Sequence, residues 1–321
     1  MEKSIFSIDE VRNLDMRSVV GYSISKLHTV YSQIVVAYAD VGSRFSIKGN
    51  IEPAELEVGI AEQSLIPILG GMAHEGLSPI GIAYAPFITM RAADQIRMTI
   101  GEMNLPIILV GGSAGLVSGN LGAASLALDD IALMRAIPNL SIFSPSDSFM
   151  MARMIETAVE IKRPVYIRAT GNSLGQTIEE KDTVDVFKYR TIYSEGSDAI
   201  IYATGASVFE AYVAAQKLYE KSIKITVVDV TSIKPLDVET LKYYSNIKYV
   251  FTVEEHNIMG GMGSAIAEHI SENYVQKVVR LGVQDTYLYP EEYRKLLVAS
   301  KIDATGIEES ILRYLKKIRE I

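Results

Sequence analysis

The chain of 321 residues contains no cysteine and no tryptophan. The absence of cysteine excludes a disulfide framework, thiolate metal ligands and a cysteine nucleophile. Histidine is also scarce, with four copies. Neither His28 with His74 nor His256 with His269 stands at a metal-ligand spacing with nearby carboxylates. The sequence therefore predicts no metal site built from its own residues.

Positive charge is the next deficit, since 31 Lys and Arg stand against 39 Asp and Glu, for a net charge of -8. This excess of acidic residues argues against nucleic acid as a partner. A membrane span needs roughly 18 mainly apolar residues, and the uncharged stretch 103–128 is interrupted by Gly, Ser and Asn. The N-terminal residues 1–15 are charged and lack the apolar core of a signal peptide. We therefore expect a cytoplasmic protein that does not enter a membrane.

Hydrophobic residues make up 48% of the chain and charged residues 22%, which is the balance of a folded protein. Short, almost wholly apolar runs alternate with longer segments of helical period, which predicts parallel sheets with helices on both faces. The runs lie at 33–38, 80–84, 106–110, 140–143, 198–202, 223–230, 249–253 and 278–281. The helical segments lie at 61–74, 91–103, 207–220 and 263–272.

The alternation weakens at 177–193, a charged stretch without a clear apolar face, and then restarts. A chain of this length also favours two packed units over one. We therefore predict an α/β fold of two mostly parallel sheet domains, at 1–190 and 191–321.

Two glycine-rich motifs could carry chemistry. GGSAG at 111–115 follows a predicted strand and fits the nucleophile elbow of hydrolases, but a glycine-rich loop follows where that elbow needs a helix. GGMGSA at 260–265 opens a helix, and its backbone N–H groups could hold a phosphate. The second motif lacks the dinucleotide-binding spacing, so tight packing between strand and helix is the favoured interpretation.

Glu62, in the segment GIAEQ at 59–63, enters an otherwise apolar helix. It is either an exposed first-turn residue that favours the helix dipole, or a buried carboxylate that needs a partner. The loop 84–87 (YAPF) and the glycine-rich loop 111–122 both follow predicted strands. Because ligands dock at the carboxyl ends of parallel strands, these segments together suggest a site for a flat heteroaromatic ligand.

These motifs and their order resemble the transketolase family over most of residues 20–310. The first unit resembles the pyrimidine-binding domain, and the second resembles the C-terminal domain. The chain is also similar to 1-deoxyxylulose-5-phosphate synthase and, more distantly, to the β subunits of 2-oxo acid dehydrogenases. The motifs are GIAEQ (59–63), 84–87, DQIR (94–97), 129–139, SPSD (144–147), SIKPLD (232–237), 253–264 and 281–288.

Full-length transketolases carry a further domain with a Gly-Asp-Gly motif for diphosphate and Mg²⁺, and this sequence contains no Gly-Asp-Gly. The chain therefore looks like the C-terminal half of a split transketolase. The resemblance implies thiamine diphosphate as cofactor, with Mg²⁺ ligands on a separate N-terminal transketolase-like subunit. It also implies a homodimer of this chain, and a heterotetramer with the partner.

The resemblance assigns Glu62 to the glutamate that hydrogen-bonds the aminopyrimidine ring and so activates the cofactor. Burial would let this carboxyl keep a proton near neutral pH. Phe87, with Tyr84 beside it, matches the aromatic loop that packs on the ring, although both could simply fill the core. Asp40 matches an aspartate of the cofactor pocket, and a strand-end turn explains it equally well.

The family's substrate contacts are largely replaced. Alignment from Asp129 places Ser113 and Ser125 at two histidine positions, and Leu121 at the aspartate that reads a sugar hydroxyl. A serine cannot act as a general base near neutral pH, and a leucine cannot accept a hydroxyl proton.

Two arginines match the family's phosphate-reading positions. Arg168 keeps one of them and Arg91 lies near another. The forked guanidinium suits phosphate because it can make two parallel hydrogen bonds. An ordinary ion pair would explain either residue as well.

The resemblance therefore implies a subunit that transfers a two-carbon ketol unit between sugar phosphates. Loss of the hydroxyl-reading aspartate at Leu121 favours instead a 2-oxo acid donor, as in deoxyxylulose-phosphate-synthase-like or dehydrogenase β-like enzymes. A third alternative is a non-catalytic paralogue. The presence of Glu62 argues against it, because an idle pocket has no reason to bury a carboxyl.

Overall fold

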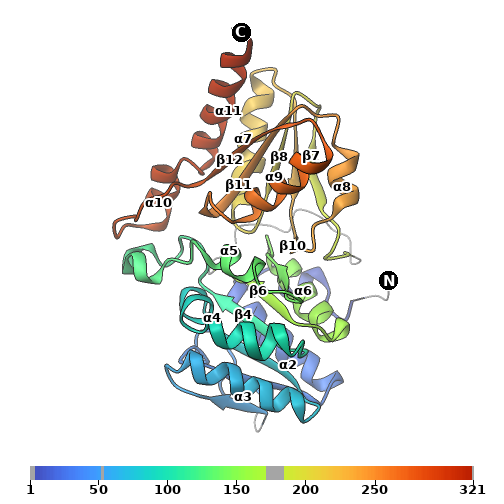
Figure 1. Cartoon of the computed structure of the whole chain (residues 1–321), viewed down its shortest axis with the longest axis vertical. Coiled ribbons are helices and arrows are strands. Elements are labelled where there is room, and N and C mark those ends of the chain that lie inside the picture. The colour runs from blue at the N-terminus through green and yellow to red at the C-terminus, as the bar shows by residue number, and fades with distance from the viewer. Residues whose placement is uncertain (1–3, 52–53, 171–183, 320–321) are drawn as a thin grey trace.

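The computed structural model describes residues 4–51, 54–170 and 184–319. It contains two α/β units, the N-terminal one below and the C-terminal one above in Figure 1. Of the predicted charged stretch 177–193, residues 177–183 lie outside the described part of the chain. In the described part of the chain, no helix is long and apolar enough to cross a membrane.

The first sheet has the strand order β10-β5-β6-β4-β3-β1-β2. Its strands pair in parallel, apart from β10, which runs antiparallel to β5. The parallel strands are β1 (Ile34–Tyr38), β2 (Glu55–Glu57), β3 (Ser78–Tyr84), β4 (Ile108–Gly112), β5 (Ser141–Phe143) and β6 (Val165–Arg168).

Apolar side chains project from both faces of this sheet, and a layer of helices packs against each face. Val36 and Tyr38 of β1 face one buried cluster, and Ala37 between them faces another, as the alternation of a strand requires. The first cluster joins α1 (Ile8–Val11), α2 (Met16–Val30) and α6 (Ser148–Ile161). The second joins α3 (Glu62–His74), η1 (Phe87–Arg91), η2 (Ile96–Glu102) and α5 (Asp130–Arg135). The short helix α4 (Ala93–Gln95) lies between η1 and η2 and adds no residue to this cluster.

The second sheet has the order β12-β11-β8-β9-β7, with β7 antiparallel at one edge. Helices α7 and α11 cover one face, and α8 and α9 cover the other. The strands are β7 (Arg190–Ser194), β8 (Ala199–Ala203), β9 (Ile225–Asp229), β11 (Tyr249–Asn257) and β12 (Lys277–Val283). The helices are α7 (Ser207–Glu220), α8 (Val238–Tyr243), α9 (Met262–Asn273), α10 (Tyr293–Ser300) and α11 (Ala304–Arg319).

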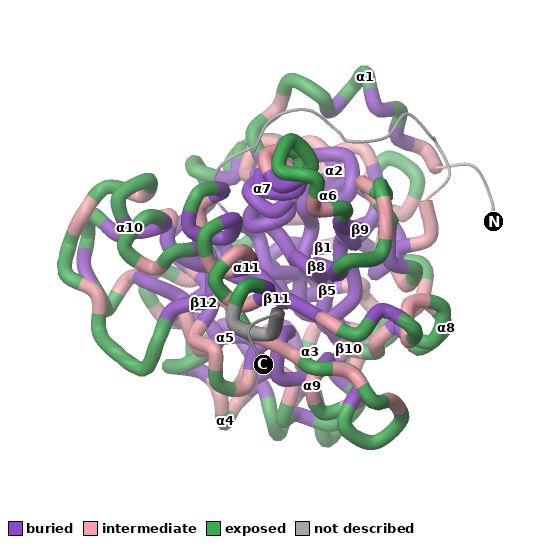
Figure 2. Tube along the Cα trace, turned by 90° about the horizontal axis from the view of Figure 1, so that it is seen from above, coloured by how far each residue is buried: buried purple, intermediate pink, exposed green. Residues whose placement is uncertain are grey.

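The two units share more than a linker. One buried cluster runs from α3 and α5 of the first unit to Tyr202 and Met262 of the second. Strand β10 (Ser232–Lys234) comes from the second half of the chain yet completes the first sheet at the junction of the halves in Figure 1. Seen from above, buried segments fill the centre of the molecule and exposed segments form its rim (Figure 2).

The predicted fold class is confirmed, since two mostly parallel sheets carry helices on both faces. Each predicted apolar run overlaps a strand, and the predicted helix 91–103 is broken into α4 and wider π-helical turns. Strands β2, β6, β7 and β10 were not predicted. They are edge strands or, for β6, a short interior strand. The domain boundary near residue 190 stays a prediction. The sequence pattern did not indicate that β10, which follows this boundary, pairs with β5 of the first sheet.

Candidate functional site

The site lies at the carboxyl edge of the first sheet, where β1, β3 and β4 end side by side. Asp40 follows β1 with φ 55°, and Ser113 follows β4 with φ 54°. A positive φ is unfavourable for a residue other than glycine, and such strain often clusters at functional edges of a fold. The two turns therefore mark this edge as a candidate binding region.

Glu62 is the first residue of α3 and only 3% exposed. Burial of a carboxylate is unfavourable without a partner. Here the guanidinium of Arg91 donates to Oε2 at 2.7 Å, and the positive end of the helix dipole adds to the stabilisation. The structure thus agrees with the buried reading of Glu62, and it gives the carboxylate a cation as its neighbour.

The aromatic loop stands next to this ion pair. The rings of Tyr84 and Phe87 meet edge to face, with centroids 6.3 Å apart, which is a favourable aromatic geometry. Arg91 also stacks over Phe87, with Cζ 4.6 Å from the ring centre. Arg91 therefore joins Glu62 to the aromatic pair, and it does not line the cavity described next.

A cavity of about 430 Å³ opens beside the aromatic loop. Among the described residues that line it, the formal charges belong to Arg17 and Arg44, and no carboxylate is present. The lining residues are Arg17, Arg44, Tyr84, Pro86, Phe87, Ser113, Val117, Ser118, Asn120, Leu121 and Ser125. In a chain with a net charge of -8, a cavity whose charged lining side chains are cationic favours an anionic ligand.

Sequence reasoning missed both arginines. Arg44 follows the predicted strand 33–38 within a short loop, so its place at a strand end was a usable signal. Its Cζ lies 5.9 Å from the ring centre of Tyr84. Arg17 sits in the first turn of α2, and no local pattern connects that turn with the cavity.

The predicted substrate residues divide into two groups. Ser113, Leu121 and Ser125 line the cavity as expected, with the Leu121 side chain largely exposed. A turn and a loop follow Ser113, where a nucleophile elbow requires a helix. The hydrolase interpretation of 111–115 therefore loses its structural context.

Arg168 is not brought to the cavity, because its side chain is only 1% exposed. Nε donates to Oδ2 of Asp130 at 2.8 Å, and Nη2 donates to the backbone oxygens of Ala127 and Glu255 at 3.1 and 2.8 Å. Burial alone would lower the pKa of Arg168, but Asp130 outweighs it and raises that pKa. The phosphate role of Arg168 stays a prediction, and this geometry gives the guanidinium a structural task instead.

Asp40 is exposed at the end of β1 and does not line the cavity. It nevertheless lies at the same sheet edge as Tyr84, because β1 and β3 are parallel neighbours. Its place in a cofactor pocket stays a prediction.

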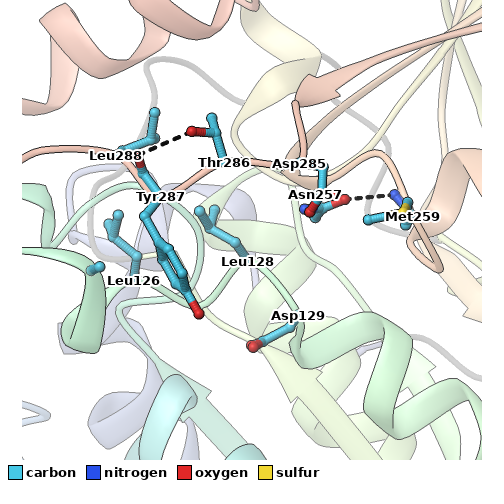
Figure 3. Close-up of a pocket in the computed structure, with 10 residues that line it drawn as sticks. Leu126, Leu128, Asp129, Asn257, Met259, Asp285, Thr286, Tyr287 and Leu288 are labelled. Atoms are coloured by element: carbon cyan, nitrogen blue, oxygen red, sulfur yellow. Dashed lines mark hydrogen bonds between the residues drawn. The ribbon is translucent and has the colours of Figure 1, made fainter.

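A second cavity of about 420 Å³ is lined by residues of both units. Figure 3 shows Tyr287 extending from the segment after β12 toward the loop that carries Leu126, Leu128 and Asp129. Burial, and then the neighbouring carboxylate of Asp130, raise the pKa of Asp129. None of the predicted site residues lines this cavity, so we place the candidate site in the first one.

The glycine cluster 260–265 is explained by an internal contact. The carboxylate of Glu254 accepts hydrogen bonds from the backbone N–H groups of Met262 and Gly263 at 2.7 and 2.8 Å. These are the N–H groups that would otherwise hold a phosphate. The cluster therefore serves to cap α9.

Comparisons with known proteins agree with this fold. The pyrimidine-binding domain of transketolase matches residues 12–176, and the transketolase C-terminal domain matches residues 188–307. The chain is 38% identical over 260 residues to one of the subunits of apulose-4-phosphate transketolase from Actinobacillus succinogenes, covering 80% of this chain and 83% of that protein. It is 33% identical over 316 residues to 1-deoxy-D-xylulose-5-phosphate synthase of Halothermothrix orenii, covering 96% of this chain and 49% of that enzyme.

A solved structure described as a split gene transketolase, inactive beta4 tetramer, superposes with a TM-score of 0.87 at 30% identity. The match covers 95% of this chain and 99% of that one. Both domain models, the relatives and this superposition point the same way. The chain belongs to the transketolase family, of which it carries the pyrimidine-binding and C-terminal domains, and this membership implies thiamine diphosphate as the cofactor.

Proposed function

We propose that this chain is the pyrimidine-binding subunit of a transketolase-like transferase that moves a two-carbon ketol unit between sugar phosphates. The observation that carries the proposal is the buried Glu62 carboxylate beside an aromatic pair, next to a cavity whose charged side chains are arginines. The first feature suits an aminopyrimidine, and the second suits a phosphorylated substrate.

The residues present fit one end of thiamine diphosphate. Glu62 would hydrogen-bond the aminopyrimidine ring, Tyr84 and Phe87 would pack on it, and we keep Asp40 as a pocket residue at the same edge. When bound, the cofactor supplies the carbon nucleophile of the reaction. The task of this chain is to hold the ring, to orient Glu62 through Arg91 and to keep water from the aromatic surface.

The cationic cavity supports a phosphorylated substrate. Arg17 and Arg44 line a space to which Ser113 and Ser125 also contribute. Guanidinium binds phosphate through paired, charge-assisted hydrogen bonds. We therefore assign phosphate binding to Arg17 and Arg44, in place of the buried Arg168.

The diphosphate end of the cofactor needs another protein. Among the described residues, no group of three or more His, Asp or Glu could hold a metal ion, and the sequence contains no Gly-Asp-Gly. Ile60, Met90 and Leu121 are 72%, 51% and 69% exposed around the candidate site, and exposed apolar surface often marks a partner contact. We propose that a separate subunit brings Mg²⁺ and the diphosphate site, in a cytoplasmic complex.

The related split gene transketolase chain described as an inactive beta4 tetramer supports a self-associating subunit that lacks activity alone. For this chain we propose a homodimer in isolation and a heterotetramer with the partner subunit. We also propose 1–190 and 191–321 as its two domains, with β10 of the second domain pairing with β5 in the sheet of the first.

A second candidate function has its own observation. Leu121 lies in the cavity wall where transketolases carry an aspartate that reads a sugar hydroxyl. A donor without that hydroxyl, such as a 2-oxo acid, needs no such contact. Similarity to a deoxyxylulose-phosphate synthase supports the same alternative.

The test is co-expression with a subunit that carries Gly-Asp-Gly, followed by a donor panel with thiamine diphosphate and Mg²⁺. We expect slow transfer from phosphorylated ketoses, because Ser113, Leu121 and Ser125 replace polar side chains that contact the substrate in transketolases. Transfer from phosphorylated ketoses should still be faster than transfer from unphosphorylated ones. Turnover with pyruvate as donor, and with none of the ketoses, would favour the second candidate. Absence of turnover with every donor would indicate a non-catalytic paralogue and refute both.

A further inference from the structure

One wall of the candidate cavity is formed by a loop whose two ends are hydrogen-bonded to each other. Gly115 and Ala127 exchange backbone hydrogen bonds at 3.2 and 3.3 Å, which closes residues 115–127 at their base. This loop contributes Val117, Ser118, Asn120, Leu121 and Ser125 to the cavity. The position of the loop therefore sets the shape of the cavity.

The second unit holds this loop at its base. Glu255 of β11 accepts a hydrogen bond from the backbone N–H of Leu116 at 2.9 Å through Oε2. Its Oε1 accepts the hydroxyl hydrogen of Tyr293, in α10, at 2.5 Å. One carboxylate thus connects β11, α10 and the loop, which come from three distant parts of the sequence.

Further contacts fix the same loop from the same side. The backbone N–H of Glu291 donates to the backbone oxygen of Gly119 at 3.2 Å. A Cβ on Gly119 would come within 2.0 Å of Leu296 of α10, and a Cβ on Gly115 within 2.5 Å of Glu255 Oε2. The glycines therefore allow the backbone of the loop to approach α10 and Glu255 closely.

The burial of Glu255 argues for a geometric role. The side chain is 1% exposed, and burial raises the pKa of this carboxyl, against the hydrogen bonds from Tyr293 and Leu116. The desolvation cost of a buried carboxylate offsets much of what its contacts contribute to stability. Its two directed hydrogen bonds, in contrast, define where the loop begins.

We propose that Glu255 is a positioning residue, through which the second unit holds the glycine-rich loop in the conformation that binds the phosphorylated substrate. The proposal rests on the proposed function, since the loop is assigned to a substrate cavity. Glu255 itself does not line that cavity, so it acts through Leu116 and the residues that follow.

Three variants test the role. Glu255→Leu removes both acceptors. Glu255→Gln keeps the geometry, because its amide oxygen can accept from Leu116 while its NH₂ donates to the Tyr293 oxygen. Tyr293→Phe removes only one donor and disturbs the fold least. Thr252→Val is the matched control, since Thr252 lies buried in the same strand and its hydroxyl finds no partner among the described residues.

The first readout is hydrogen–deuterium exchange of amides 115–122 in the isolated full chain, without substrate. We expect exchange about tenfold faster in Glu255→Leu, about threefold faster in Tyr293→Phe, and near wild type in Glu255→Gln and Thr252→Val. Unchanged exchange in both Glu255→Leu and Tyr293→Phe would overturn the proposal. This readout holds whether or not the chain proves to be a transferase.

The second readout uses the complex with its partner subunit and a phosphorylated ketose. We expect Glu255→Leu to raise KM about tenfold, to lower kcat much less, and to leave deuterium exchange at cofactor C2 unchanged, with Glu255→Gln restoring KM. Equal loss of kcat and of C2 exchange would show general structural damage and contradict positioning. A wild-type complex without turnover would refute the proposed function, and the loop exchange would still decide the role of Glu255.

Discussion

At the scale of single residues, the site depends on where each guanidinium group lies. Arg91 pairs with Glu62, and Arg168 pairs with Asp130. Arg17 and Arg44 line the cavity. All four arginines stand near strand or helix ends in the sequence, so local pattern could not separate them. The carboxylate partners of Arg91 and Arg168 come from distant segments, and only the fold brings each pair together.

Glu62→Gln should leave the fold intact and slow deuterium exchange at C2 of the cofactor by orders of magnitude. The amide keeps the size of the carboxyl but cannot share a proton with the ring in the same way. The measurement is C2 exchange in the complex with the partner subunit. Exchange at the wild-type rate would remove Glu62 from cofactor activation.

Arg44→Gln should raise KM for a phosphorylated ketose about tenfold or more, because a charge-assisted contact to phosphate is lost. KM for the unphosphorylated ketose should change little. Arg97→Gln serves as the control, since Arg97 forms an exposed ion pair with Asp94 away from the cavity. An equal effect on both ketoses would contradict a phosphate contact at Arg44.

At the scale of elements, hydrophobic periodicity located the central strands apart from β6, and helices α3, α7 and α9, but it did not indicate α2, α6 or α11. Strands that are buried on both faces carry the strongest apolar signal. Three-residue edge strands such as β2 and β10 carry too little of it to be recognised. The cavity loop 111–122 was expected at a strand end, but its 3₁₀ turn η3 (Gly119–Leu121) contacts the second unit, where the Glu291 N–H donates to the Gly119 oxygen.

The start of α8 provides a test of how the segment before β7 is held. Asp237 caps this helix and accepts from the backbone N–H of Tyr189 at 3.0 Å and from the Thr240 hydroxyl at 2.6 Å. Burial tends to raise the pKa of Asp237, but the bonds from Thr240, Tyr189 and Lys188 outweigh it, so the pKa lies below its usual 3.8.

Asp237→Asn should therefore lower the free energy of unfolding by about 1–2 kcal/mol at pH 7, because the neutral amide has one acceptor oxygen where both oxygens of the carboxylate accept hydrogen bonds. A carboxyl with a depressed pKa stabilises the fold above its unfolded pKa, and this contribution disappears as pH falls through the folded value. The difference between wild type and variant, measured by urea unfolding from pH 7 to pH 3, should thus shrink below about pH 4. A difference that stays constant with pH would contradict the charge-dependent contribution.

At the scale of the whole molecule, the two units form one body with a shared core. Arg190 of β7 pairs with Asp229 at 2.5 Å in its own unit and with Asp147 at 3.2 Å in the first. The resemblance to transketolase predicted both domains and the family. It did not indicate that β10 crosses between sheets or that Glu255 reaches the cavity loop, because both depend on contacts far apart in sequence.

The central claim is that this chain forms only one wall of a thiamine diphosphate site. The most direct measurement is calorimetric titration of thiamine diphosphate with Mg²⁺ into the isolated chain and into its complex with the Gly-Asp-Gly subunit, with turnover assayed on the same samples. The account predicts micromolar binding and turnover in the complex, and neither in the isolated chain. Micromolar binding with turnover by this polypeptide alone would contradict it.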